Sequence, residues 1–168
     1  MFDNGREIPV EWKPQATSRN CFVCGRENPV GLHIRFYEDL TNARVVVPLM
    51  IPDTYQGYPG IAHGGILATI LDELSGRALM MGADDDVFWV TAKLEVRYRK
   101  PTPTETELTA VGWVVNKRRR TAEVAGEIRL PDGTVTVEAT AVVVLPPKDT
   151  LQRWDEESEG WRVEGVGD

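Results

Sequence analysis

Every second residue is hydrophobic in two stretches of the N-terminal half, residues 32–37 and 43–49. Such alternation is typical of a strand that buries one face. Residues 39–42, which include Asp39 and Asn42, separate the two stretches and favour a turn, so the pattern predicts a β-hairpin. The segment that follows, residues 51–65, contains two prolines and four glycines, and we expect it to form a loop.

Residues 64–81 have a different period. Their apolar side chains recur at intervals of three and four positions, which is the period of a helix. No proline interrupts the stretch, and Gly82 suits a C-terminal cap. Because most of the circumference is apolar, we expect a buried helix. The repeating residues are Ile66, Leu67, Ile70, Leu71, Leu74 and Ala78.

Four more alternating stretches follow, at residues 88–99, 108–115, 121–130 and 135–145. Pro131-Asp132-Gly133 is a turn signal, because it combines a fixed φ, a side chain that bonds its own backbone and a residue free to take positive φ. One helix among consecutive antiparallel strands predicts an α+β protein. A long antiparallel sheet wrapped around the helix is the simplest way to bury it.

Length and composition limit the possible classes of protein. The chain has 168 residues, 42% of them hydrophobic, which suits one globular domain. A net charge of −7 argues against nucleic-acid binding, since phosphates attract a basic surface. No stretch is apolar enough to span a membrane, and no secretory signal is expected. The two cysteines fit a reducing compartment, so we expect a cytoplasmic protein.

We divide the chain into an N-terminal lead-in (1–20), a folded domain (21–146) and an acidic C-terminal tail (147–168). From residue 148 onward the tail has three basic and seven acidic residues, which is typical of a solvated segment. Trp154 and Trp161 within it suggest that part of the tail docks on the domain.

His63-Gly64-Gly65 leads directly into the predicted helix. The N–H groups of a first helical turn have no intrahelical partner and lie at the positive end of the helix dipole. They could therefore bind a carbonyl oxygen and stabilise it as it becomes an oxyanion. Alternatively, the tripeptide is only a loop-to-helix junction with glycines that pack tightly.

Asp72 is the other candidate for chemistry. A carboxylate in a largely apolar helix is costly unless it is paired, hydrogen-bonded or functional. It either shares an exposed polar stripe with Glu73 or faces a cavity as a base or nucleophile. Gly64 and Asp72 are eight residues apart, about 12 Å along a helix. If both act on one carbonyl group, two antiparallel helices of a two-fold dimer must form the site.

The segment HGGILATILDE, after a Gly-Tyr-Pro-Gly loop and before a strand reading WVTAKLEVRYRKPTP, resembles the hot-dog-fold acyl-CoA thioesterases. The most similar branch is the PaaI-like, phenylacetyl-CoA thioesterase group, over roughly residues 20–146. The resemblance implies hydrolysis of acyl-CoA without a cofactor. It also implies a long sheet around one central helix, in dimers or dimers of dimers (homotetramers) whose sheets join side by side.

The same resemblance assigns roles to residues of this chain. The Gly64 N–H, helped by Gly65 and His63, would polarise the thioester carbonyl. Asp72 of the opposing subunit would attack the carbonyl carbon or activate water. The remaining candidates are Thr91, which would position the water or Asp72, and Ser75.

Basic residues cluster in an otherwise acidic chain. Eight of the 19 lie between residues 93 and 120, which suits a ligand with phosphates such as coenzyme A. Arg97, Arg99 and Lys100, near a strand end, are the better candidates. The run at 117–120 is more simply a solvated turn.

Cys21 and Cys24 form a C-x-x-C motif, which supplies two of the four ligands of a structural zinc site. His33 could be a third, and a second subunit could complete the set. The pair could also be redox-active, or the cysteines could be small buried side chains. We expect no metal.

Two other functions remain open: a non-catalytic acyl-CoA binding or sensor protein, and a hot-dog hydratase or dehydratase. Enzymes of the second kind usually pair an acid with a histidine. His33 and His63 are the only histidines here, which counts against it.

Overall fold

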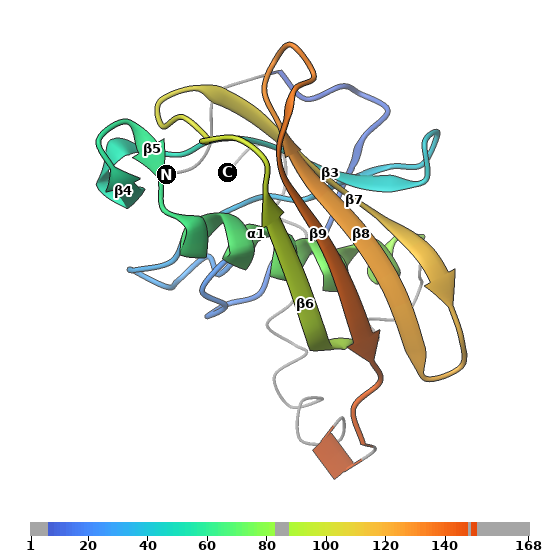
Figure 1. Cartoon of the computed structure of the whole chain (residues 1–168). Coiled ribbons are helices and arrows are strands. Elements are labelled where there is room, and N and C mark those ends of the chain that lie inside the picture. The colour runs from blue at the N-terminus through green and yellow to red at the C-terminus, as the bar shows by residue number, and fades with distance from the viewer. Residues whose placement is uncertain (1–6, 83–87, 148, 151–168) are drawn as a thin grey trace.

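The computed structural model describes residues 7–82, 88–147 and 149–150. A curved antiparallel sheet wraps around one helix, α1 (Gly64–Met80), as Figure 1 shows. The strand order is β1-β2-β3-β7-β8-β9-β6. This arrangement confirms the predicted α+β fold. The strands are β1 (Lys13–Pro14), β2 (Tyr37–Asp39), β3 (Arg44–Met50), β6 (Val90–Tyr98), β7 (Glu107–Lys117), β8 (Thr121–Arg129) and β9 (Val135–Val144).

Two glycines of the sheet lie directly against leucine side chains of the helix. Gly112 on β7 pairs in register with Gly126 on β8. A Cβ atom at Gly112 would lie 2.6 Å from Cγ of Leu74, and one at Gly126 would lie 3.2 Å from Cδ2 of Leu71. Both leucines are 1% exposed. Burial of each leucine side chain contributes about 1.5–3 kcal/mol. Because Gly112 and Gly126 carry no Cβ atom, the helix can pack this closely on the sheet.

The four strands predicted after the helix are all present, and the predicted turn joins β8 to β9. Asp132 Oδ1 accepts a 2.8 Å hydrogen bond from the Thr134 N–H, and Gly133 has a φ of 83°. At the other end of the helix, Gly82 has a φ of 67°, which agrees with its expected capping role.

The prediction that residues 32–36 belong to the first strand of the hairpin was wrong. These residues bury Leu32, Ile34 and Phe36, as the alternation indicated. However, the N–H groups of Leu32 and Ile34 donate to the carbonyls of Phe22 and Val23 rather than to a neighbouring strand, and His33 has a φ of 53°. The pairing with β3 is confined to Tyr37–Asp39.

Two regions expected to be irregular contain short elements. In the lead-in, β1 pairs with β2 at one end of the sheet. In the loop before the helix lie a 3₁₀ turn (Asp53–Tyr55) and a small sheet of β4 (Gln56–Tyr58) and β5 (Ile61–Ala62). The tail tryptophans lie outside the described residues.

β6 is the strand at the other end of the sheet and pairs with β9. Its second edge has no partner strand in the described parts of this single chain. The register shifts between Thr91 and Lys93, so the strand carries a bulge near its start. No described helix is long and apolar enough to cross a membrane.

Candidate active site

The first turn of α1 holds a single backbone donor that is ready to bind a ligand. His63 is the N-cap, and its Nδ1 accepts a 2.9 Å hydrogen bond from the Gly65 N–H. The His63 N–H donates to the Tyr55 carbonyl. The Gly64 N–H has no hydrogen-bond partner within the described residues, as expected for the start of a helix. Of the three predicted donors, only Gly64 is therefore unoccupied.

Tyr98, at the end of β6, holds Gly64 in place. Its hydroxyl donates a 2.7 Å hydrogen bond to the Gly64 carbonyl oxygen. A Cβ atom at Gly64 would lie 3.2–3.3 Å from the phenol group, tighter than ordinary packing. The close approach of Tyr98 explains why glycine occupies this position. The sequence pattern showed Tyr98 only as one more alternating residue, because its contact with the helix is tertiary.

An open hollow of about 410 Å³ adjoins this junction. It brings together Gly64 and two of the predicted phosphate-binding residues, whereas the third, Arg97, does not line it. Its lining residues are Ile61, Ala62, Gly64, Leu67, Tyr98, Arg99, Lys100, Pro101 and Thr102. A carbonyl group in the hollow could thus be near the Gly64 N–H while a charged group lies near Lys100.

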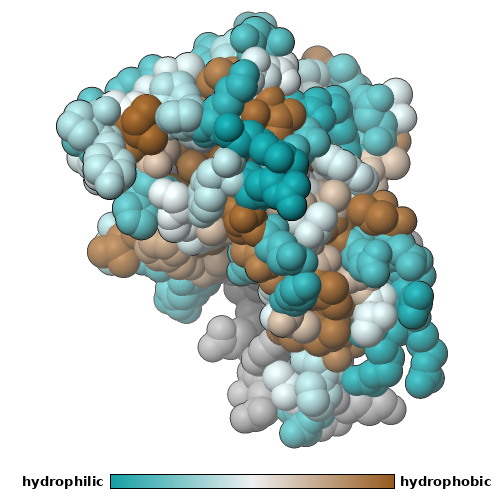
Figure 2. Space-filling model, viewed as in Figure 1, coloured by the Kyte–Doolittle hydropathy of each residue, from teal (hydrophilic) through white to brown (hydrophobic). Residues whose placement is uncertain are grey.

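The two cations of the hollow differ in their surroundings. Arg99 forms a 2.8 Å ion pair with Glu138 on β9. The hydrogen bond between them raises the pKa of Arg99 and lowers the pKa of Glu138. Hydrogen bonds from Thr134 lower the pKa of Asp132, and the charge of Lys100 adds a smaller effect in the same direction. Figure 2 shows hydrophilic and hydrophobic residues interspersed over this side of the molecule.

Asp72 lies on an exposed part of α1 and does not line the hollow. It is eight residues beyond Gly64, about 12 Å along the helix. The helix runs beside β6: Gly64 contacts Tyr98 near one end, and Gly76 approaches Trp89 near the other. Asp72 and the exposed Thr91 both belong to the segments between these contacts. One chain does not bring Asp72 to the Gly64 N–H.

Ser75 is placed differently from the other candidates. It is 4% exposed, and its hydroxyl donates a 2.9 Å hydrogen bond to the Leu71 carbonyl one turn earlier. The side chain belongs to the core rather than to the hollow.

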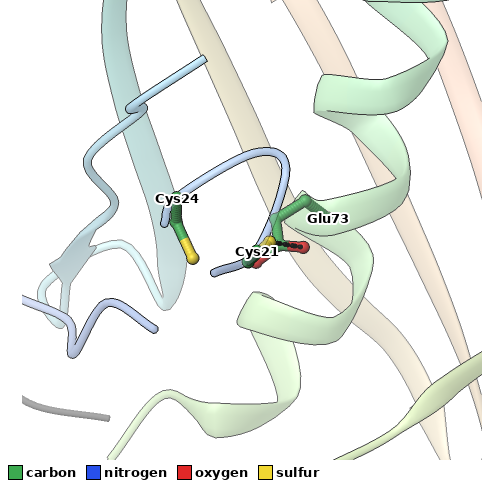
Figure 3. A group of neighbouring side chains, drawn as sticks. All are labelled: Cys21, Cys24 and Glu73. Carbon is green, nitrogen blue, oxygen red and sulfur yellow. Dashed lines mark hydrogen bonds between the residues drawn. The ribbon is translucent and has the colours of Figure 1, made fainter. Parts of the chain in front are cut away.

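The two cysteines are free thiols that lie against α1 (Figure 3). Cys21 Sγ is 3.8 Å from a carboxylate oxygen of Glu73, and Arg77 donates a 2.8 Å hydrogen bond to Cys24 Sγ. A hydrogen bond from the Cys21 thiol, with a smaller effect of the Arg77 cation, lowers the pKa of Cys24 to about 6. His33 is not part of this cluster. Sequence reasoning missed Glu73 and Arg77 as neighbours of the motif.

Comparison with known proteins agrees with this fold. Residues 59–137 match the model of the thioesterase superfamily, a range that includes α1, Tyr98 and the lining of the hollow. The chain is therefore similar to the thioesterase superfamily over slightly less than half of its length. It is 27% identical to the acyl-coenzyme A thioesterase THEM4 of Rattus norvegicus over 139 residues, 82% of this chain and 59% of the relative.

Two solved structures extend the comparison. The thioesterase superfamily protein RHA08564 is 34% identical, with a TM-score of 0.68, over 75% of this chain and 63% of that one. A hypothetical thioesterase of Streptococcus pneumoniae, crystallised with coenzyme A, is 28% identical with a TM-score of 0.55, over 61% of this chain and 80% of that one. The chain thus spans about three fifths of the length of both the rat THEM4 protein and RHA08564.

Proposed function

We propose that this protein hydrolyses acyl-CoA thioesters to a free acid and coenzyme A, in a site shared by two subunits. The observation that carries the proposal is the unoccupied N–H of Gly64, a residue that lines the same hollow as Arg99 and Lys100. The hollow thus combines a donor for a carbonyl oxygen with cations for phosphates. The names of the relatives, an acyl-CoA thioesterase and a thioesterase bound to coenzyme A, support this choice of substrate.

The Gly64 N–H would stabilise the negative charge that develops on the thioester oxygen. At the N-terminus of a 17-residue helix this donor is reinforced by the helix dipole. His63 Nδ1 accepts the hydrogen bond of the Gly65 N–H, and Tyr98 binds the carbonyl oxygen of Gly64, in the peptide group that follows the donor. A donor held in place before the reaction needs no reorganisation when the oxyanion forms.

The carboxylate would come from Asp72 of the second subunit, because the Asp72 of the same chain is too far along the helix. Pairing of two β6 edges around a two-fold axis would continue the sheet and set the two helices antiparallel. β6 is the end strand of the sheet, and its second edge has no partner strand in the described residues, which supports this edge as the contact. Asp72 would attack the carbonyl carbon or remove a proton from water, and Thr91 would position one of them. The coenzyme A thiolate then leaves and takes up the proton that the attacking water loses. Where Asp72 is the nucleophile, that water hydrolyses the acyl-Asp72 anhydride to the free acid and restores the carboxylate.

Lys100 and Arg97 would attract the phosphates of coenzyme A, and Arg99 would do so while Glu138 holds its guanidinium. These side chains are exposed, so their attraction would be screened by salt. That the protein forms a homodimer or a dimer of dimers remains a prediction from the sequence. Its cytoplasmic location is a prediction of the same kind.

The test is release of free thiol from a panel of acyl-CoAs, from short to long and including aromatic ones. We expect Asp72→Asn to keep the fold and lose at least about 100-fold in kcat, the scale of a general base or nucleophile. Asp149→Asn, which alters another exposed carboxylate, is the matched control and should retain full activity. Near wild-type turnover by folded Asp72→Asn would remove Asp72 from the mechanism. Tight binding of acyl-CoA without any thiol release by the wild type would favour a sensor instead.

A further inference from the structure

The C-x-x-C loop and α1 bring three metal-ligating groups together. Cys21 Sγ, Cys24 Sγ and a carboxylate oxygen of Glu73 all lie within 4.8 Å of one another. The Cys21–Glu73 distance is 3.8 Å. Bonds of 2.0–2.3 Å to a tetrahedral zinc ion place ligand atoms about 3.3–3.8 Å apart. The cluster therefore needs only small shifts to reach the ligand spacing of such a site. In Figure 3 the Cys24 sulfur turns toward the space that Cys21 and Glu73 occupy.

The loop is built to present both sulfurs on one side. The Gly25 N–H donates a 2.8 Å hydrogen bond to the Cys21 carbonyl and closes a tight turn. A Cβ atom at Gly25 would lie 2.3 Å from that carbonyl oxygen, so the turn requires glycine. The Val23 N–H also donates a 3.3 Å hydrogen bond to Cys21 Sγ. Backbone N–H groups aimed at sulfur stabilise the thiolate form that binds metals.

Arg77 connects two of the three groups and is itself 1% exposed. Its Nε donates a 2.9 Å hydrogen bond to Glu73, and its Nη2 donates one of 2.8 Å to Cys24 Sγ. Outer partners of this kind orient the ligands of metal sites. Two thiolates and one carboxylate would be balanced by a dipositive ion together with the Arg77 guanidinium. A site of this composition is neutral overall, which a buried position favours.

We propose that Cys21, Cys24 and Glu73 bind one zinc ion, with water as the fourth ligand on the half-exposed side of the cluster. The expectation of no metal was based on the two ligands visible in the motif, whereas the fold adds Glu73 and leaves His33 outside. The ion would fasten the N-terminal loop to α1 at the residue next to Asp72. Because the unfolded chain lacks this site, zinc binding would stabilise the folded protein.

Zinc content and thiol reactivity of the full chain test the proposal without reference to its activity. The chain is expressed with zinc, purified without chelators or metal-affinity steps, and analysed by mass spectrometry of the elements. The metal-free wild type, prepared with a chelator under reducing conditions, is then titrated with Zn²⁺ against a chromophoric chelator. The chain has only two cysteines, so a thiol reagent reports on this site alone.

We expect about one zinc per wild-type chain, thiols that react more slowly with zinc than without it, and a higher melting temperature with zinc. Glu73→Gln keeps both thiols and the side-chain shape, and it should bind zinc at least about 10-fold more weakly. His33→Gln is the matched control and should bind as the wild type does. Cys24→Ser should lose zinc, but the titration of the wild type needs no variant and stands even if that protein fails to fold.

Three results would overturn the proposal. A folded, reduced wild type that takes up no zinc in the titration would exclude the site. Equal zinc affinity in Glu73→Gln would remove Glu73 from it. A pair that forms a disulfide readily, with a reduced form indifferent to zinc, would show that the motif is redox-active instead.

Discussion

The Tyr98 hydroxyl donates a 2.7 Å hydrogen bond to the carbonyl oxygen of Gly64, and this bond joins the end of β6 to the first turn of α1. The N–H group of the same residue, Gly64, is the one donor of the first helical turn that has no partner within the described residues. Tyr98 is 52% exposed, so it forms both the wall of the hollow and a support for its backbone. We interpret it as a positioning residue for the Gly64 N–H.

Tyr98→Phe removes this hydrogen bond and keeps the ring. We expect kcat to fall about 3–10-fold, because a net hydrogen bond contributes about 0.5–1.5 kcal/mol and 1.4 kcal/mol corresponds to a factor of ten. Steady-state kinetics with the preferred acyl-CoA measure the effect, and KM should change less than kcat. An unchanged kcat in a folded variant would show that the hydroxyl does not support catalysis.

Gly112→Ala tests how the helix is fitted to the sheet. The new Cβ atom would lie 2.6 Å from Cγ of Leu74. We expect the free energy of unfolding to fall by about 1–3 kcal/mol, the usual cost of overpacking. Urea unfolding measures it. Gly76→Ala, whose Cβ atom would meet nothing closer than 3.8 Å, is the matched control. As a helical Gly→Ala change it should be neutral or stabilise by up to about 1 kcal/mol.

Shortening Leu74 provides a second check on the same contact. Leu74→Ala alone should destabilise the protein by about 2–5 kcal/mol, since it leaves a cavity. In combination with Gly112→Ala the two losses should be less than additive. Strict additivity would show that these two residues do not compete for the same space.

Asp39 makes the β2–β3 turn sensitive to acid. Burial by itself would raise the pKa of Asp39, but hydrogen bonds from Asn42 and Arg44 outweigh it and hold the pKa below its usual value. A lowered pKa stabilises the folded chain above the ordinary pKa of about 3.9, and this contribution is lost as the pH falls through the folded value.

We therefore expect Asp39→Asn to lower the free energy of unfolding by about 1–3 kcal/mol at pH 7. Below about pH 4 the difference from the wild type should shrink, because the unfolded chain then binds a proton at this carboxylate. The difference should vanish once the pH has fallen through the folded pKa of Asp39. Urea unfolding at several pH values measures this. A difference that stays constant down to the acid limit would contradict the assigned role of the carboxylate.

Much of the fold could be predicted from periodicity. The helix at 64–80 and the strands β6 to β9 follow regular apolar patterns, and each pattern reflects burial against a single layer. The same reasoning failed at residues 32–36. There the alternation indicated burial correctly. However, the N–H groups of Leu32 and Ile34 donate to the carbonyls of Phe22 and Val23 and not to the other strand of the predicted hairpin. Side-chain burial does not reveal which backbone groups are bonded.

The candidate site divides in the same way. Gly64 and Asp72 could be chosen from local features, a helix start and a carboxylate in an apolar helix. Tyr98 and Glu73 could not be chosen in this way. Tyr98 contacts Gly64, which is 34 positions away, and Glu73 contacts Cys21, which is 52 positions away. Neither distance leaves a local signal. Arg99 and Lys100 could be chosen from their place in a basic stretch at a strand end. The hollow that brings them near Gly64 could not be predicted, because the tertiary fold forms it.

The central claim is that Gly64 of one subunit acts with Asp72 of the other. The most direct measurement uses purified mixed dimers of two inactive variants, Gly64→Val and Asp72→Asn, with a different tag on each. In a mixed dimer one site receives both defects and the other receives neither. A shared site predicts activity of up to about half that of the wild type, although both parent homodimers are inactive. If each site were contained in one chain, every site would keep a defect. Mixed dimers that remain inactive would contradict the account.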